Sequence, residues 1–166
     1  MVGLFWVTEE AVYLGMPPVP QGKGVRMSGT ALRITGPEER VWAWSELMDL
    51  RVEHVPVRSV LVRWATRGAL FAAAALDAWL PGSPAEMTVV ISTGNDQTET
   101  GVLSAAATAY TQREVDLSHA LLSHFVRGTA SPTILTDWWN KTQPAQILRS
   151  RQREALLEEW TAPLLA

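Results

Sequence analysis

The side chains best suited to bind a metal, or to move protons near neutral pH, are the three histidines. Their spacing supports neither role. His119 and His124 are five residues apart, so on a helix they point about 140° apart and cannot hold one metal ion together. Asp116 precedes His119 by three residues and can face the same way, but two ligands do not complete a site. We therefore predict no metal site.

Covalent catalysis also lacks the residues that it needs. The 166-residue chain contains no cysteine, which excludes a thiol nucleophile, a disulfide framework and a cysteine-ligated metal. No serine lies in a G-x-S-x-G nucleophile motif. The acidic pairs are adjacent in sequence, which is typical of solvated positions rather than of an acid–base couple. We predict a protein that is not an enzyme and carries no cofactor.

A loop rich in glycine and proline, residues 15–24, carries cations that could bind an anion. Lys23 lies within this loop and Arg26 follows shortly after it. The phosphate-loop motif is incomplete, because Lys23 is followed by glycine instead of serine or threonine. Lys23 and Arg26 are thus possible anion-binding residues, and a solvated loop is the better explanation of the two.

Charge and composition exclude several classes of protein. Basic side chains number 14 and acidic ones 17, and the resulting net charge of −3 does not suit a nucleic-acid-binding protein. Glu9 and Glu10 interrupt an N-terminus that has no basic flank. The most apolar stretch, 68–80, is too short to span a bilayer. We expect a cytoplasmic protein with no integral membrane segment.

Eight tryptophans are the most unusual feature of the composition. The rings whose sequence surroundings predict core positions are Trp42, Trp44, Trp64 and Trp79. Trp138 and Trp139 lie instead in a polar segment, where at least one ring is expected to be partly exposed. Exposed aromatic side chains of this kind anchor protein interfaces. The alternative is that the two rings cover the core beneath a long loop.

The first part of the chain predicts short strands, because β-prone runs alternate with glycine and proline. Residues 32–34 and 41–44 form a hairpin, and Trp42 and Trp44 share one face of its second strand. The strands that this pattern predicts are 5–7, 11–14, 25–27, 31–35, 41–44, 50–57 and 60–64.

The centre of the chain changes character. Residues 68–80 are rich in alanine and apolar all round, which predicts a buried helix with Thr66 as its N-cap. The apolar runs 87–91 and 101–103 flank the polar segment 92–100. That pattern predicts a hairpin with a polar tip.

A capping box marks the start of an amphipathic helix. Thr111 and Glu114 have the spacing at which each side chain bonds the other residue's backbone amide, and Gly128 supplies the C-terminal stop. Helical projection places His124 on the solvated face. The apolar face consists of Val115, Leu121, Leu122, Phe125 and Val126.

The remaining chain predicts a loop over 129–143 and a second helix over 145–161, ended by Pro163. In this helix the arginines precede the glutamates, which opposes the helix dipole. Packing, rather than intrinsic propensity, must therefore hold it. Its interrupted apolar stripe includes Leu156, Leu157 and Trp160.

The segment Leu32-Arg-Ile-Thr35, followed by Val41-Trp-Ala-Trp-Ser-Glu-Leu47, resembles a strand pair of bacterial pleckstrin-homology-like (PH-like) domains. The resemblance covers residues 5–127, and the composition is similar to that of actinobacterial proteins. It implies a bent antiparallel sheet closed at one end by the helix 112–127. It also implies binding of peptides, proteins or anionic lipid headgroups, the last through a basic loop that only Lys23 and Arg26 match.

We thus predict an α+β fold: a bent antiparallel sheet or partly open PH-like barrel closed by an amphipathic helix, with a central alanine-rich helix and a C-terminal helical extension. Residues 1–128 form the β-rich domain. Residues 129–166 form a loop and a helix that packs on that domain or on a partner.

The predicted function is a non-enzymatic interaction or assembly module that binds a protein partner or a second copy of itself. The residues expected to make the contact are Trp138, Trp139, Leu156, Leu157 and Trp160. The alternative is a small-ligand-binding protein or enzyme with an apolar pocket lined by tryptophans. Docking on an anionic membrane surface through Lys23 and Arg26 is a weaker alternative.

Overall fold

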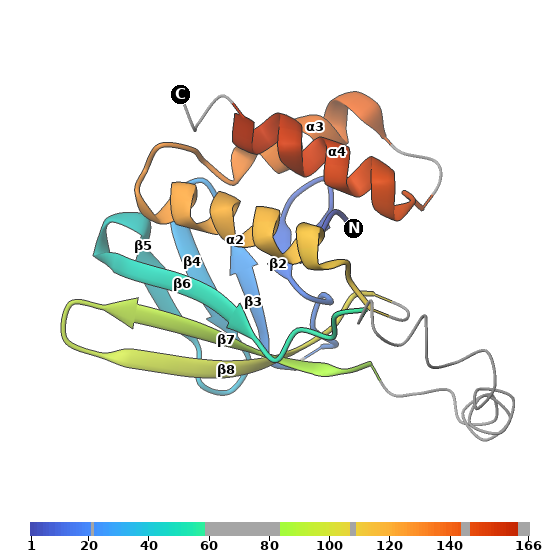
Figure 1. Ribbon diagram of the computed structural model, residues 1–166. Helices are drawn as coiled ribbons and strands as arrows, with labels where there is room; N and C mark the ends of the chain where they lie inside the picture. Colours follow the sequence, from blue (N-terminus) through green and yellow to red (C-terminus); the bar gives the residue numbers. More distant parts are fainter. Residues whose placement is uncertain (21, 59–83, 107–108, 144–146, 163–166) are drawn as a thin grey trace, which may run out of the picture.

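The computed structural model describes residues 1–20, 22–58, 84–106, 109–143 and 147–162. This part of the chain is an α+β structure, in which two antiparallel sheets share one core and the helices lie along one side (Figure 1). The strands are β1 (Phe5–Val7), β2 (Val12–Leu14), β3 (Gly24–Met27), β4 (Ala31–Thr35), β5 (Arg40–Ala43), β6 (Leu47–Glu53), β7 (Glu86–Thr93) and β8 (Gln97–Leu103). The helices are the 3-10 turn η1 (Trp44–Glu46), α2 (Gln112–Val126), α3 (Thr133–Thr142) and α4 (Ser150–Thr161).

Both sheets are meanders, ordered β1-β2-β3-β4-β5 and β6-β7-β8. The two hairpins that the sequence predicts are confirmed: Leu32 lies opposite Trp42, and Met87 lies opposite Val102. In the second hairpin the strands run further than predicted, so the polar tip shrinks to residues 94–96. Pairing across the two strands places these extra residues in the sheet, although not all of them have a high β propensity of their own.

Alternation along the strands builds the core. In β3, Val25 and Met27 are buried while Arg26 between them points to the opposite face. The same pattern buries Phe5 and Val7 of β1. The inward faces of both sheets therefore form one hydrophobic core together with α2.

The two sheets are not closed into a barrel. The chain leaves β5 at Ala43 and makes the turn η1 before β6 begins, and Glu46 fixes the turn by accepting a hydrogen bond from Ala43 N at 2.6 Å. Trp44, predicted as the end of a strand, is thus the first residue of this turn. Its ring contacts Phe125 edge to face, and its Nε1 donates to Ser28 O at 2.9 Å.

The capping box at the start of α2 is confirmed. Glu114 N donates to Thr111 Oγ1 at 3.1 Å, and Thr111 N donates to Glu114 Oε2 at 2.9 Å. Gly128 ends the helix in the left-handed region, with a φ of 68°. Between these ends α2 packs against β6, where His119 Nε2 lies 3.1 Å from Val52 O.

His124 is buried, contrary to the prediction of a solvated position, with 3% of its surface exposed. The chain turns back after Gly128 and brings Thr129 to the edge of the ring, where Thr129 Oγ1 lies 2.9 Å from His124 Nδ1. Helical projection alone could not show this return of the chain. Burial, followed by the nearby charge of Arg127, lowers the pKa of His124.

Residues 133–142 form the helix α3, and the prediction of a loop here was wrong. Tryptophan, threonine and asparagine have modest helix propensity, so the local composition favoured a loop. Tertiary packing overrides that preference, because Leu135 is fully buried and α3 lies against β1. The helix ends at Gln143, which has a positive φ of 38°.

Helix α4 packs on α2 within the same chain (Figure 1). Arg153 Nε donates to Glu114 Oε1, Arg113 Nε donates to Glu158 Oε1 at 2.6 Å, and Thr111 Oγ1 donates to Glu154. Contacts across the interface thus hold a helix whose charge order opposes its own dipole. The predicted strand 60–64 and helix 68–80, with Thr66, Trp64 and Trp79, lie outside the described residues.

Candidate functional site

Three tryptophans meet where α3 and α4 lie together. The centroids of Trp138 and Trp139 are 6.3 Å apart, and those of Trp138 and Trp160 are 5.7 Å apart. Both pairs are edge to face, with interplanar angles of 64° and 72°. All three rings are partly exposed. The structure therefore brings together three of the residues that the sequence proposed as a binding surface, and we call them the tryptophan face.

A groove of about 300 Å³ lies beside the tryptophan face, between α3 and α4. Trp138 and Trp160 line it, together with Asp137 and Lys141 of α3 and Glu159 of α4. Within the described part of the chain, none of these three charged side chains forms an ion pair. An aromatic surface surrounded by solvated charges matches the usual anatomy of a protein interface, an apolar centre with a polar rim.

The two leucines of the predicted binding set have different positions. Leu156 is partly exposed, whereas Leu157 is fully buried. A Cβ added to Gly3 would lie 2.8 Å from Leu157 Cδ1, so this leucine packs against the N-terminal segment. Leu157 belongs to the core of this chain. The sequence pattern of α4 could not show which leucine is buried and which is partly exposed, because the two are adjacent in the same apolar stripe.

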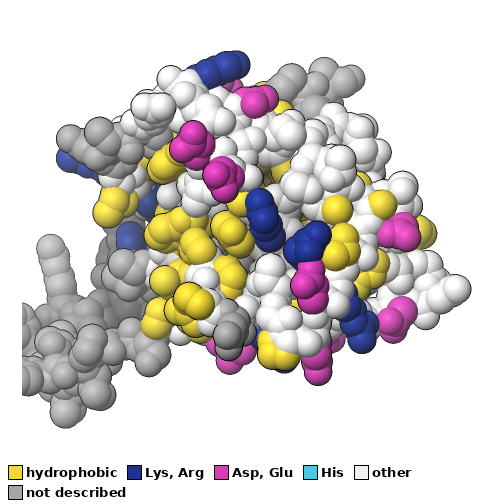
Figure 2. All heavy atoms as spheres, turned by 180° about the vertical axis from the view of Figure 1, so that it is seen from behind, with side chains coloured by type: hydrophobic (Ala, Val, Ile, Leu, Met, Phe, Trp, Pro, Cys, Tyr) yellow, Lys and Arg dark blue, Asp and Glu magenta, His cyan; other side chains and the backbone are white. Residues whose placement is uncertain are grey.

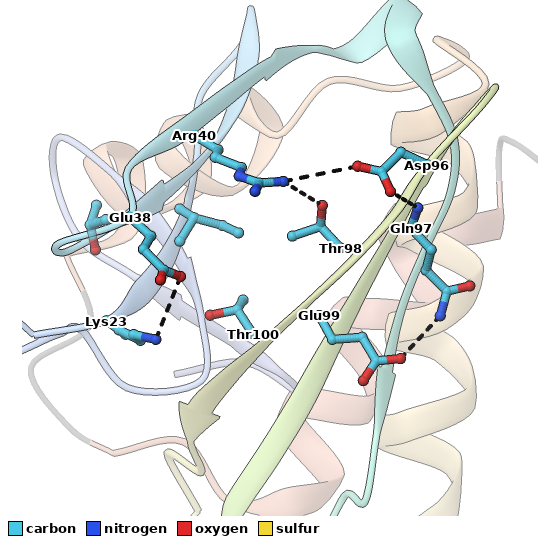
Figure 3. A pocket seen from close by; sticks show the side chains of 10 residues that line it. Lys23, Glu38, Arg40, Asp96, Gln97, Thr98, Glu99 and Thr100 are labelled. Carbon is cyan, nitrogen blue, oxygen red and sulfur yellow. Dashed lines mark hydrogen bonds and ion pairs between the residues drawn. The ribbon is translucent and has the colours of Figure 1, made fainter.

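A polar pocket of about 310 Å³ lies between the turn that joins β4 to β5 and the hairpin of β7 and β8 (Figure 3). Lys23 Nζ faces Glu38 Oε2 at 3.9 Å, and Arg40 faces Asp96 Oδ2 at 4.0 Å. Arg40 also donates to Thr98 Oγ1 at 3.2 Å. Each cation thus has an acidic neighbour, and a third carboxylate, from Glu99, also lines the pocket.

Lys23 and Arg26 do not form one anion-binding patch. Lys23 lines the polar pocket, whereas Arg26 points from β3 to the outer face of the five-stranded sheet. Loop residues close in sequence separate here because a strand begins between them, at Gly24. The positive charges of Lys23 and Arg26 therefore do not combine at one place on the surface.

The outer face of the five-stranded sheet carries a row that sequence reasoning missed. The strand register places Trp6, Tyr13, Arg26 and Arg33 side by side, one from each of β1 to β4. Seen from behind, the molecule shows hydrophobic side chains gathered beside basic ones (Figure 2). Period-two alternation could have assigned Trp6 and Tyr13 outward, but only the register places them in one row.

Comparison with protein-family models, with curated proteins and with solved structures found no match to this chain. None of the described helices is long and apolar enough to cross a membrane. Among the described residues, no three His, Asp or Glu side chains are grouped as metal ligands would be.

Proposed function

We propose that this protein is a non-enzymatic interaction module, and that the tryptophan face binds a protein partner or a second copy of the chain. The observation that carries the proposal is the contact of three partly exposed indole rings beside a groove between two helices. Tryptophan is enriched among the residues that dominate binding energy at interfaces. Rings that already contact one another lose little conformational entropy when a partner covers them.

The ion pairs between α2 and α4 support this proposal. They fix α4 on α2, and α4 carries Trp160 to its contact with Trp138. A preformed surface of this kind can bind without first ordering its side chains. The tryptophan face is therefore built in advance of binding.

The proposal is tested by sedimentation velocity of the full chain over a wide range of concentration, combined with affinity capture. The double variant Trp138→Ser/Trp160→Ser removes the face, and Met48→Ser is the matched control, because Met48 is 72% exposed and lies on β6. We expect a dimer, or a captured partner, that is lost in the double variant and kept in the control. A monomer at every concentration, with the same captured proteins for all three chains, would contradict the proposal.

We further infer that the β-rich part is a PH-like domain. Two antiparallel meanders followed by an amphipathic helix support this inference, as does the pairing of β4 with β5 in the segment that carries the resemblance. Such domains present binding surfaces on a rigid scaffold, which agrees with a module without catalysis. An experimental structure whose strands superpose on a PH-like domain in the same order would support it, and a different strand order would contradict it.

Of the alternatives, membrane docking gains no support from the geometry, because Lys23 and Arg26 are separated and Lys23 faces a carboxylate. The alternative of a small-ligand site in a pocket lined by tryptophans gains no support from Trp44. Its ring packs on Phe125, and its indole nitrogen donates to Ser28 O.

A further inference from the structure

A second groove, of about 490 Å³, lies where four separate segments of the chain meet. These are the N-terminal segment, Arg58 in the connection that follows β6, the connection from β8 to α2, and the start of α4. The apolar side chains that line it are Met1, Trp6, Ala105, Ala106, Ala109 and Ile147. Among its described lining residues, every ionisable side chain is an arginine: Arg58, Arg149 and Arg153. We call this the arginine groove.

The apolar wall of the arginine groove is held in place by hydrogen bonds. Ala105 N donates to Tyr110 OH at 3.1 Å, and Ala106 N donates to Ser104 Oγ at 3.2 Å. Tyr110 is fully buried, and burial raises the pKa of its hydroxyl, so the hydroxyl stays neutral. The part of the wall that Ala105 and Ala106 form is therefore held in place before any ligand arrives, as is usual for small-molecule sites.

The arginines at the rim have different roles. Arg153 is nearly buried and neutralised by Glu114, and it donates to Leu148 O at 2.7 Å, so it is part of the frame. Arg149 is exposed and forms no ion pair within the described residues. Its positive charge therefore remains available at the edge of an apolar groove.

We propose that the arginine groove binds an anionic amphiphile: a molecule with one carboxylate on a hydrocarbon chain. Charge complementarity selects the head group, because Arg149 can hold a carboxylate through two parallel hydrogen bonds. Trp6 and the three alanines then cover the chain. The volume lies within the range of about 300 to 1,000 Å³ that is typical of small-molecule sites. This site is separate from the tryptophan face and does not depend on the function proposed for that face.

Isothermal titration of the full chain with decanoate, below its micellar concentration, tests the proposal. We expect saturable binding of one decanoate per chain, with decanol and acetate each binding at least about tenfold more weakly, because each lacks one of the two contacts. Removing two methylenes from the chain is expected to weaken binding by about tenfold. Equal affinity for decanol would overturn the role of the arginine. Equal affinity for acetate would overturn the role of the apolar wall.

Two arginines of the same helix turn provide a matched pair of variants. Arg149→Gln removes the charge that lines the groove, whereas Arg151→Gln removes the same charge from an exposed residue outside its lining. We expect Arg149→Gln to weaken decanoate binding by about fivefold or more and Arg151→Gln to leave it unchanged. An equal loss in both variants would show a general charge effect and would overturn the proposal. Because both residues are exposed, the thermal unfolding midpoint is expected to be the same in both chains.

Discussion

Helix α2 has two packed sides, and they are held by different interactions. Toward the sheets it presents apolar side chains, such as Leu121, Leu122 and Phe125, that are at most 1% exposed. Toward α4 it presents a buried carboxylate, Glu114, which is paired with Arg153. Apolar packing is non-directional and stabilises the fold in proportion to the area that it buries. A buried ion pair adds little net stability, but it disfavours any docking position that leaves a charge unpaired.

This difference explains how α4, a helix of poor intrinsic stability, can hold part of the tryptophan face in a fixed position. The apolar side of α2 supplies the stability of the scaffold. The charged side selects one position for α4, and that position sets Trp160 against Trp138.

Phe125→Ala should have the largest effect. Phe125 is 1% exposed and contacts the rings of Phe5 and Trp44, so its loss leaves a cavity at the centre of the apolar side. We expect the free energy of unfolding to fall by about 4 kcal/mol, measured by urea denaturation. A loss below about 1 kcal/mol would mean that the apolar side does not supply the main stability.

Arg153→Met should have the next largest effect, because it leaves the buried carboxylate of Glu114 without its partner. We expect the free energy of unfolding, measured by urea denaturation, to fall by about 3 kcal/mol. The double variant Glu114→Gln/Arg153→Met removes both charges and keeps an oxygen for the capping box. We expect it to be more stable than the single variant Arg153→Met. The single variant Glu114→Gln completes the cycle. If the losses of the two single variants simply add in the double variant, the pair does not act as a unit and the comparison between the two sides fails.

Gly3→Ala tests the contact beneath α4. Gly3 has a φ of 53°, and an added Cβ would collide with Ser118 Oγ and with the buried Leu157. We expect a loss of about 2 kcal/mol in the free energy of unfolding. Gly94→Ala is the control, because a Cβ at Gly94 would meet nothing within 4 Å, and it should change stability by less than about 0.5 kcal/mol. Similar losses at both glycines would contradict the packing described for α4.

The smallest effect concerns pH. Burial lowers the pKa of His124 below its value in the unfolded chain, which is about 6.5, so the unfolded state binds the proton more readily. This contribution to stability is fully present above about pH 6.5 and is lost as the pH falls through the folded pKa. Unfolding curves recorded between pH 7.5 and 5 should show this loss for the wild type, and His124→Gln should show a shallower dependence. An unchanged slope in the variant would show that His124 is not responsible.

Signals confined to a few residues predicted their elements well. The capping box of Thr111 and Glu114 located the start of α2, because both of its hydrogen bonds lie within four residues. Helix α3 was missed, because its formation depends on burying Leu135 against a strand more than a hundred residues earlier in the chain.

The sites show the same division. The exposed position of Trp138 and Trp139 could be predicted from their polar surroundings, but their contact with Trp160 required the docking of α4. The arginine groove had no signal in the sequence, since its four segments are brought together only by the fold.

The most direct test of the central claim compares two tryptophans in parallel. Trp44 packs on the apolar side, beside Phe125, and Trp160 lies on the tryptophan face. Sedimentation velocity, affinity capture of a partner and thermal unfolding would be recorded for Trp44→Ser and Trp160→Ser. We predict that Trp160→Ser abolishes association. Both rings are partly buried against the core, but we expect Trp44→Ser to lower the unfolding midpoint more than Trp160→Ser does, and to leave association intact at temperatures below its own midpoint. Association that survives Trp160→Ser unchanged would contradict the account.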